Sequence, residues 1–173
     1  PSPTRSAVLV RRSNGHIRIG TFQRLAYLNQ QDNLEILIDY LRDNYFTHIN
    51  KSSNRDVFIE KIFLECVKKI AASMGKIIIS GFVHGVLNTD NFNVTGEVFD
   101  FGPWRFIQYA NQNFTAAYFD YNGRYSFGRQ PEAALWALTQ LGKSLNKLIN
   151  EKRVIEILNE FSINFHLSLK NHF

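Results

Sequence analysis

The sequence predicts a mainly α-helical protein with one small β-hairpin, an α+β fold in a single domain over residues 1–173. Three observations support this prediction. Apolar residues recur three or four positions apart through several long segments, which is the period of an amphipathic helix. A Thr-Gly pair at 95–96 separates two short β-rich runs, which is typical of a hairpin. Hydrophobic residues make up 45% and charged residues 20%, so the chain can bury a globular core.

The first third of the chain predicts one strand and two helices. Ala7–Ser13 is short and β-rich, and a turn-forming Ser-Asn-Gly follows it, so we expect a strand there. A helix should begin near Thr21. A second helix should cover residues 31–46, where the apolar period is helical and Asp32 or Asn33 would supply the N-terminal cap.

The longest periodic segment begins at Asn54 and predicts a long helix. Gly75 and the β-branched residues after it favour a break near Met74, followed by a strand. The apolar period nevertheless continues as far as Gly81, which favours one helix with a weak point. The residues on its apolar face are Phe58, Ile62, Cys66, Ile70, Met74 and Ile77.

The second half of the chain predicts the hairpin and two more helices. The hairpin covers residues 92–99. Residues 104–130 are aromatic and turn-rich and indicate no regular element. A helical apolar period follows over 131–150, with Pro131 at a favourable first helical position. Residues 151–173 predict the final helix.

Composition excludes several classes of function. The net charge of +5 comes from scattered Lys and Arg, without the basic stripe that nucleic-acid binding needs. The only cysteine, Cys66, excludes a disulfide framework and a Cys-based metal site. No apolar run reaches the roughly 18 residues of a membrane span. The start, PSPTRSAVLV, resembles neither a signal peptide nor an initiator-Met terminus, so it indicates a cut inside a longer protein. We expect a cytoplasmic location, or a mitochondrial one in a eukaryote.

The stretch HGVLNTDNFNVTGEVFDFGPW, from His84 to Trp104, follows the pattern of a protein-kinase catalytic site. In that pattern a catalytic loop carries a proton-accepting Asp and, five residues later, a metal-binding Asn, and an Asp-Phe-Gly turn follows a hairpin. Asn91 and Asp100 occupy the two metal-binding positions, but Val86 stands at the position of the base. Helices around a small central hairpin also match the larger lobe of a kinase-like fold.

A displaced carboxylate can replace the missing base. Val86 cannot accept a proton, whereas Asp90 lies four positions further along the same loop and would serve as general base if the loop directs it at the incoming hydroxyl. The oxygen atoms of Asn91 and Asp100 suit Mg²⁺, or Mn²⁺ in its place. Taken singly, Asp90 and Asn91 are also ordinary turn residues, so the joint spacing carries the prediction.

Three blocks in order make the resemblance more specific: LVRRSNGHIRIGTF, GFVHGVLNTDNFNVTGEVFDFGPW and GRYSFGRQPEAALWALTQL. They resemble the signatures of the selenoprotein O family, also known as SelO or YdiU. The resemblance implies a pseudokinase fold that transfers AMP from ATP to Ser, Thr or Tyr hydroxyls of proteins. The nucleotide is then reversed relative to a kinase, so that its α-phosphate meets the catalytic loop.

The resemblance also implies roles for individual residues. Asp90 would be the general base, Asn91 and Asp100 would hold the metal, and Arg11 and Arg18 would grip the reversed triphosphate. Asp100 would thereby also contact the nucleotide. Arginine suits this task because its guanidinium stays charged and binds phosphate in a bidentate way. Without the resemblance, Arg11 and Arg18 would be interpreted as surface residues.

Other residues near the expected site have supporting roles. His84 is expected to pack under the catalytic loop and fix its backbone, and Gly102 closes the turn after Asp100. Arg124 and Tyr125 would shape the cleft floor or the side that faces the protein substrate. Arg129 stands where the family often has Asn, which is a departure from the family pattern.

The chain lacks two parts that the family resemblance implies. No glycine-rich nucleotide loop or phosphate-binding lysine strand of an N-terminal lobe is recognisable, nor is a redox-active C-terminal extension. We therefore expect residues 1–173 to be the C-lobe part of the enzyme, with an incomplete catalytic apparatus. Two alternatives remain at this point: a kinase-type phosphotransferase that uses the same site, and a non-catalytic interaction domain that keeps the fold.

Overall fold

The computed structural model describes residues 8, 10–49 and 54–172, and its architecture is mostly helical with one two-stranded antiparallel sheet. The predicted α+β class is therefore confirmed. A short 3-10 helix, η1 (Phe127–Arg129), precedes the fourth helix. The helices are α1 (Ile19–Tyr27), α2 (Gln31–Asn44), α3 (Arg55–Ile79), α4 (Gln130–Ser144) and α5 (Glu151–His172); the strands are β1 (Phe82–Val83) and β2 (Arg105–Phe106).

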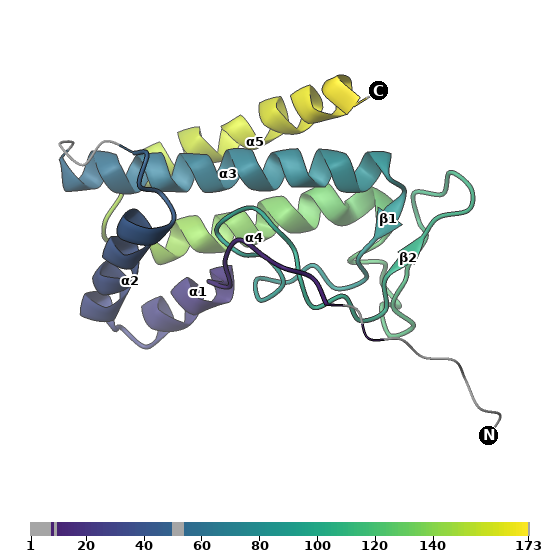
Figure 1. Cartoon of the computed structure of the whole chain (residues 1–173), viewed down its shortest axis with the longest axis horizontal. Coiled ribbons are helices and arrows are strands. Elements are labelled where there is room, and N and C mark those ends of the chain that lie inside the picture. Colours follow the sequence, from purple (N-terminus) through teal and green to yellow (C-terminus); the bar gives the residue numbers. More distant parts are fainter. Residues whose placement is uncertain (1–7, 9, 50–53, 173) are drawn as a thin grey trace.

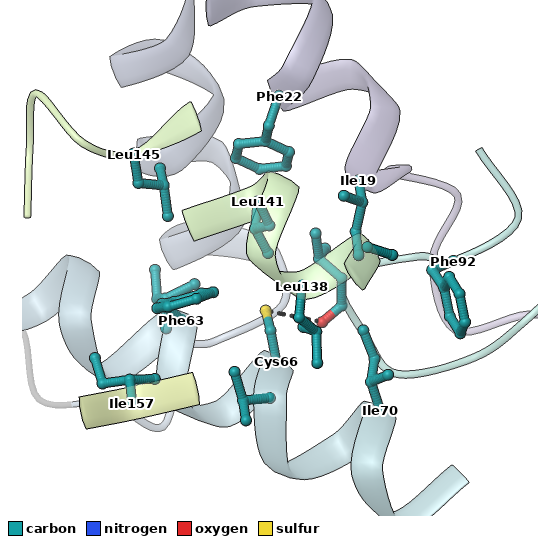
Figure 2. Packing of buried hydrophobic residues seen from close by; sticks show 14 of the residues in the cluster. Ile19, Phe22, Phe63, Cys66, Ile70, Phe92, Leu138, Leu141, Leu145 and Ile157 are labelled. Carbon is teal, nitrogen blue, oxygen red and sulfur yellow. Dashed lines mark hydrogen bonds between the residues drawn. The ribbon is translucent and has the colours of Figure 1, made fainter. Parts of the chain in front are cut away.

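Helix α3 is the central element of the molecule. Helix α5 packs along one side of α3, α4 lies along another side, and α1 packs against α4 (Figure 1). Figure 2 shows how side chains from four helices and the loop after β1 meet between these elements. The labelled residues are Ile19, Phe22, Phe63, Cys66, Ile70, Phe92, Leu138, Leu141, Leu145 and Ile157, all of which are buried.

The long helix is continuous, as the apolar period predicted. Gly75 lies inside α3 without breaking it. At this position α5 approaches α3 so closely that a larger residue would not fit. A Cβ at position 75 would overlap the side chain of Ser168, whose hydroxyl donates a hydrogen bond to the carbonyl of Ala72 at 2.9 Å. The expected weak point is therefore a helix–helix contact.

Cys66 fixes the loop after β1 to α3. Its Sγ donates to the carbonyl oxygen of Val94 at 3.2 Å (Figure 2). Burial raises the pKa of this thiol to about 12, so it stays protonated and unreactive at neutral pH. Two turns further along α3, the Ser73 hydroxyl donates to the carbonyl of Gly96. The tip of the hairpin region therefore rests on α3.

The strand expected at Ala7–Ser13 is not present in the described residues of that segment. Val8 and residues 10–13 are irregular, while Ala7 and Leu9 lie outside the described residues. The backbone forms a β-bridge only after this segment, where Arg18 pairs with Asn93 in an isolated antiparallel bridge. A β-rich composition forms a strand only where a partner edge is available.

Three helices differ in detail from the prediction. Helix α1 begins at Ile19, two residues before the expected Thr21. Helix α2 begins at Gln31, as predicted, but it ends at Asn44 and has no side-chain cap, and the expected caps Asp32 and Asn33 lie inside its first turn. The helix expected over 131–150 ends at Ser144. Turns follow the helix, and the side chains of Leu145 and Ile149 in these turns are buried. The apolar pattern beyond Ser144 therefore indicates buried residues, not a continuing helix.

The hairpin at 92–99 is reduced to a single bridge, between Phe92 and Val98. Its turn is organised by Asn93, whose side-chain oxygen accepts hydrogen bonds from the backbone of Thr95 at 3.1 Å and of Glu97 at 2.9 Å. The regular strands β1 and β2 lie on either side of this region, a pairing that the sequence did not predict. Within the described part of the chain, no helix is long and apolar enough to cross a membrane.

Candidate active site

The loop from residue 84 to residue 104 carries the expected site residues, and the two strands hold its ends together. The loop leaves the end of β1 and returns at the start of β2, with Phe82 opposite Phe106. The backbone N–H of Ile107 donates to the carbonyl of Gly81 at 2.8 Å, which extends the pairing by one step. This arrangement places the start and the end of the loop side by side, and Gln130 at the beginning of α4 bonds the start of the loop.

His84 is buried and connects the two halves of the loop. Its ring Nε2 bonds the carbonyl of Phe99 at 2.9 Å, and its Nδ1 accepts from the backbone N–H of Val86 at 3.3 Å. These partners assign the proton to Nε2. Burial lowers the pKa of His84 below its ordinary value, although the bond to Phe99 opposes this shift. The imidazole is therefore neutral at physiological pH.

The structure places Asp90 at the surface, above the first turn of α1. The side-chain oxygen of Asn88 accepts from the backbone N–H groups of Asp90 at 3.0 Å and Asn91 at 3.1 Å, which fixes the turn. The Asp90 carboxylate lies against the backbone of Gly20, where a Cβ would collide with it. A carboxylate is electrostatically favoured at this end of a helix.

Helix α1 is bonded to the loop by its first backbone N–H groups. Ile19 donates to the carbonyl of Phe92 and Gly20 to that of Thr89, both at 3.0 Å. These two bonds satisfy donors that a helix N-terminus otherwise leaves free. They also fix the loop on both sides of Asp90, so the position of the carboxylate depends on α1.

Asn91 is buried, and its backbone pairs with the segment that leads to Asp100. Its Nδ2 donates to the carbonyl of Val86 at 2.7 Å, so Oδ1 is the amide atom that a cation can use. The backbone N–H of Phe99 donates to the carbonyl of Asn91 at 3.2 Å. The amide of Asn91 and the carboxylate of Asp100 therefore belong to neighbouring strands of the same irregular hairpin.

Arg18 joins the two acidic positions of the site. Its Nη1 donates to the Asp100 carboxylate at 2.7 Å and to the backbone carbonyl of Asp90 at 3.0 Å. Asp100 has a φ of +60°, a left-handed conformation that costs a non-glycine residue about 1 kcal/mol or more. Such backbone strain clusters at functional sites. The structure thus brings Arg18, Asp90 and Asp100 together, and the backbone of Asn91 pairs with Phe99 beside them.

Both arginines lie on aromatic rings of the Asp-Phe-Gly region. The Arg11 guanidinium is 4.5 Å from the centre of the Phe101 ring and also donates to the carbonyl of Val98. The Arg18 guanidinium is 4.6 Å from the centre of the Phe99 ring. Rings on one side leave the other side of each guanidinium available to an anion.

Glu97 ties the arginine-bearing segment to the hairpin turn. Its carboxylate accepts hydrogen bonds from Ser13, Asn14 and Asn93 at 2.9 to 3.3 Å. Burial by itself would raise the pKa of Glu97, but these hydrogen bonds lower it below its ordinary value. Glu97 is therefore ionised at neutral pH and holds the segment that leads to Arg18.

The oxygen donors fit a metal ion that arrives with a nucleotide. Among the residues that the structure describes, no group of three or more His, Cys, Asp and Glu side chains forms a metal site. Asn91 and Asp100 instead offer one amide and one carboxylate oxygen. Mg²⁺ is commonly held by one or two carboxylates with waters and substrate phosphates, which matches this pair.

The glycines and Gln130 complete the site. Gly85 has a φ of +88° and packs against Pro103, whereas Gly102 faces open space. Sequence reasoning missed Gln130, whose Oε1 accepts from the backbone N–H of His84 at 3.0 Å and whose Nε2 donates to the carbonyl of Phe82 at 2.9 Å. A polar residue before Pro131 looks like a helix-start residue, so its burial had no sequence signal.

The model of the family described as "Protein adenylyltransferase SelO" matches residues 1–173. The chain belongs to the SelO family. It is 42% identical over 161 residues to "Protein nucleotidyltransferase YdiU" of Synechocystis sp., which covers 93% of this chain and 34% of the relative. The relatives of the same name from Trichormus variabilis and Photobacterium profundum are 43% and 35% identical, over 87% and 98% of this chain.

The SelO chain described here spans about a third of the length of the curated relatives that it matches. The family resemblance predicted from the three sequence blocks is thereby confirmed. The relatives are named as nucleotidyltransferases of proteins, which agrees with the predicted class of enzyme.

Proposed function

We propose that this protein transfers AMP from ATP to Ser, Thr or Tyr hydroxyls of other proteins, with Mg²⁺ or Mn²⁺. In this proposal residues 1–173 form a kinase-like C-lobe that carries the catalytic loop. The observation that carries it is the bridge made by Arg18. One guanidinium nitrogen contacts the loop at Asp90 and the carboxylate of Asp100, so the candidate base, metal ligand and phosphate-binding cation share one place.

The proposed reaction assigns one task to each group. The acceptor oxygen forms a bond to the α-phosphorus of ATP, the bond to the β-phosphate oxygen breaks, and pyrophosphate leaves. Asp90 accepts the proton of the acceptor hydroxyl. Arg11 and Arg18 bind the phosphates and offset the negative charge that builds up on them. A metal ion at Asn91 and Asp100 would further neutralise the phosphate oxygens when bound.

In this proposal Arg18 can bind either the Asp100 carboxylate or the triphosphate of ATP. Its bond to Asp100 is half exposed, with 40% and 53% of the two side chains accessible, so the ion pair is worth at most about 1 kcal/mol. A triphosphate with its metal ion offers a larger negative charge to Arg18 and a competing cation to Asp100. The pair therefore holds the loops in place before the nucleotide arrives and is weak enough to be exchanged.

Label transfer from ATP tests the proposal in the full natural protein. We expect α-labelled ATP to mark a protein acceptor and γ-labelled ATP to leave it unmarked. Transfer of the γ-label would instead support a kinase-type phosphotransferase, and transfer of neither label a non-catalytic domain. Chelation of divalent metal should abolish the α-label signal.

Two variants separate the roles of the carboxylates. Asp90→Asn should lower the rate of AMP transfer about 100- to 10,000-fold, the usual contribution of a general base, with ATP binding retained. Asp100→Asn should weaken the binding of Mg·ATP, because Asn tolerates the left-handed backbone but lacks the charge. Asp32→Asn, on the exposed side of α2, is the matched control and should change neither quantity.

A further inference from the structure

A cavity of 210 Å³ lies between the catalytic loop and the start of α4. Leu87, three residues before Asp90, contributes to its wall, so the cavity adjoins the loop that would handle the acceptor hydroxyl. Its volume is below the 300–1,000 Å³ or so of pockets that take whole small-molecule ligands, and suits a single side chain. The residues that line it are Leu87, Arg124, Tyr125, Arg129, Glu132, Ala133 and Trp136.

Arg124 is a positioned cation at this cavity. Its guanidinium lies 5.0 Å from the ring centre of Trp136 and 5.6 Å from that of Tyr125. No ion pair to Arg124 is formed within the part of the chain that the structure describes. Stacking on aromatic rings restricts the side chain without neutralising its charge. Arg124 is therefore oriented and free to bind an anion.

The other charges at the cavity are already matched. Arg129 donates to both oxygens of the Glu132 carboxylate, at 3.0 and 3.3 Å. The Asp120 carboxylate accepts from the backbone N–H groups of Arg124 at 2.7 Å and Tyr125 at 2.8 Å. Asp120 thus fixes the backbone that presents Arg124. The charge left without a partner at the cavity is positive.

We propose that this cavity binds an acidic side chain of the acceptor protein, next in sequence or space to the hydroxyl that receives AMP. The carboxylate would pair with Arg124, and the aliphatic part of the side chain would lie on the exposed ring of Trp136. The inference rests on the proposed function, because it assigns the acceptor to this side of the loop. It adds a preference: Asp or Glu near the modified residue.

Paired peptides test this preference directly in the full natural protein. Each pair carries one acceptor Tyr and either Glu or Gln at one flanking position, and binding is measured by fluorescence anisotropy of a labelled peptide. We expect Glu to bind about two- to fivefold more tightly at one or two positions, because Arg124 is exposed and an exposed ion pair contributes up to about 1 kcal/mol. Equal binding of Glu and Gln peptides at every position would overturn the proposal, and this comparison needs no variant.

Variants assign the preference to one residue. Arg124→Met keeps the length of the side chain and should abolish the preference for Glu, whereas Arg124→Lys should retain part of it. Arg24→Gln, on the exposed face of α1, is the control and should leave the preference intact. A preference that survives Arg124→Met would contradict the assignment.

Anisotropy also keeps the two proposals separate. If the Glu preference is present but no peptide receives AMP, the proposed function fails and the acidic-side-chain site stands. If AMP is transferred equally to Glu and Gln peptides, with equal binding, the site fails and the proposed function stands.

Discussion

Asp90 owes its position to a residue without a side chain. Gly20, in the first turn of α1, leaves the space in which the carboxylate lies, and two backbone hydrogen bonds from α1 fix the loop around it. The end of a flexible side chain can move aside cheaply, whereas a helix backbone cannot. Occupying this space should therefore displace the proposed base and leave the fold unchanged.

Gly20→Ala is the variant that tests this arrangement. We expect AMP transfer to fall about 100-fold, near the lower end of what a misplaced general base costs. The thermal midpoint should stay the same or rise, because Ala is up to about 1 kcal/mol more favourable than Gly within a helix. Steady-state kinetics and a thermal melt measure the two effects. A variant with normal activity would show that Asp90 does not act from its present position.

Sequence spacing predicted which chemical groups come together, but not what holds them. Asn91 follows Val86 by five residues, and Asp100 lies further along the same continuous stretch of the chain. The spacing of the motif is therefore enough to identify both metal-binding positions. Gly20 and Gln130 act from α1 and α4, which are distant in sequence. Their roles depend on how closely α1 and α4 pack against the loop in the folded protein, and a local sequence pattern does not indicate this.

Helices α3 and α5 approach each other closely at a point where each has a small residue. Gly75 and Ser168 allow this approach, and the Ser168 hydroxyl bonds the backbone of α3. Because α3 carries Cys66 and Ser73, which fix the loop, a shift of α5 against α3 also changes the support of the candidate site.

Gly75→Ala should destabilise the protein by about 1–3 kcal/mol, the usual cost of overpacking, despite the better helix propensity of Ala. Urea unfolding measures the change. Ser168→Gly removes the opposing atoms, so the double variant should be more stable than the sum of the two single effects predicts. Simple additivity would indicate that the helices move apart without strain.

Helical elements were easier to predict than strands for a physical reason. An amphipathic helix satisfies its own backbone, so a run such as residues 151–172 shows its period locally. A strand depends on a partner edge that the sequence does not reveal. The β-rich start of the chain had no such edge in the described residues, while Phe82–Val83 found one more than twenty residues away.

At the scale of the whole molecule, His84 connects three parts of the fold. Its backbone bonds Gln130 of α4, and its ring bonds the loop at Phe99 and Val86. Protonation would place a charge in a buried site and would remove the acceptor at Nδ1. The folded state therefore binds a proton at His84 less readily than the unfolded chain does.

Acid should destabilise the protein through His84. Because the folded pKa is lowered, the unfolded chain takes up the proton first, near pH 6.5. The free energy of unfolding should fall as the pH drops from 7.5 to 5.5, by at most about 1.4 kcal/mol per pH unit from this one group. In His84→Gln, whose amide can still donate to Phe99, urea midpoints should fall less over this range. An equal fall in both proteins would contradict this role.

The pairing of β1 with β2 has a consequence for how this site can change. Because the polypeptide enters and leaves the 84–104 region through adjoining residues, the two ends of the region keep their places whichever residues lie between them. Grafting this region between homologues should therefore preserve the site only if the grafted segment still offers hydrogen-bond acceptors to α1 and α3 and a donor to Gln130.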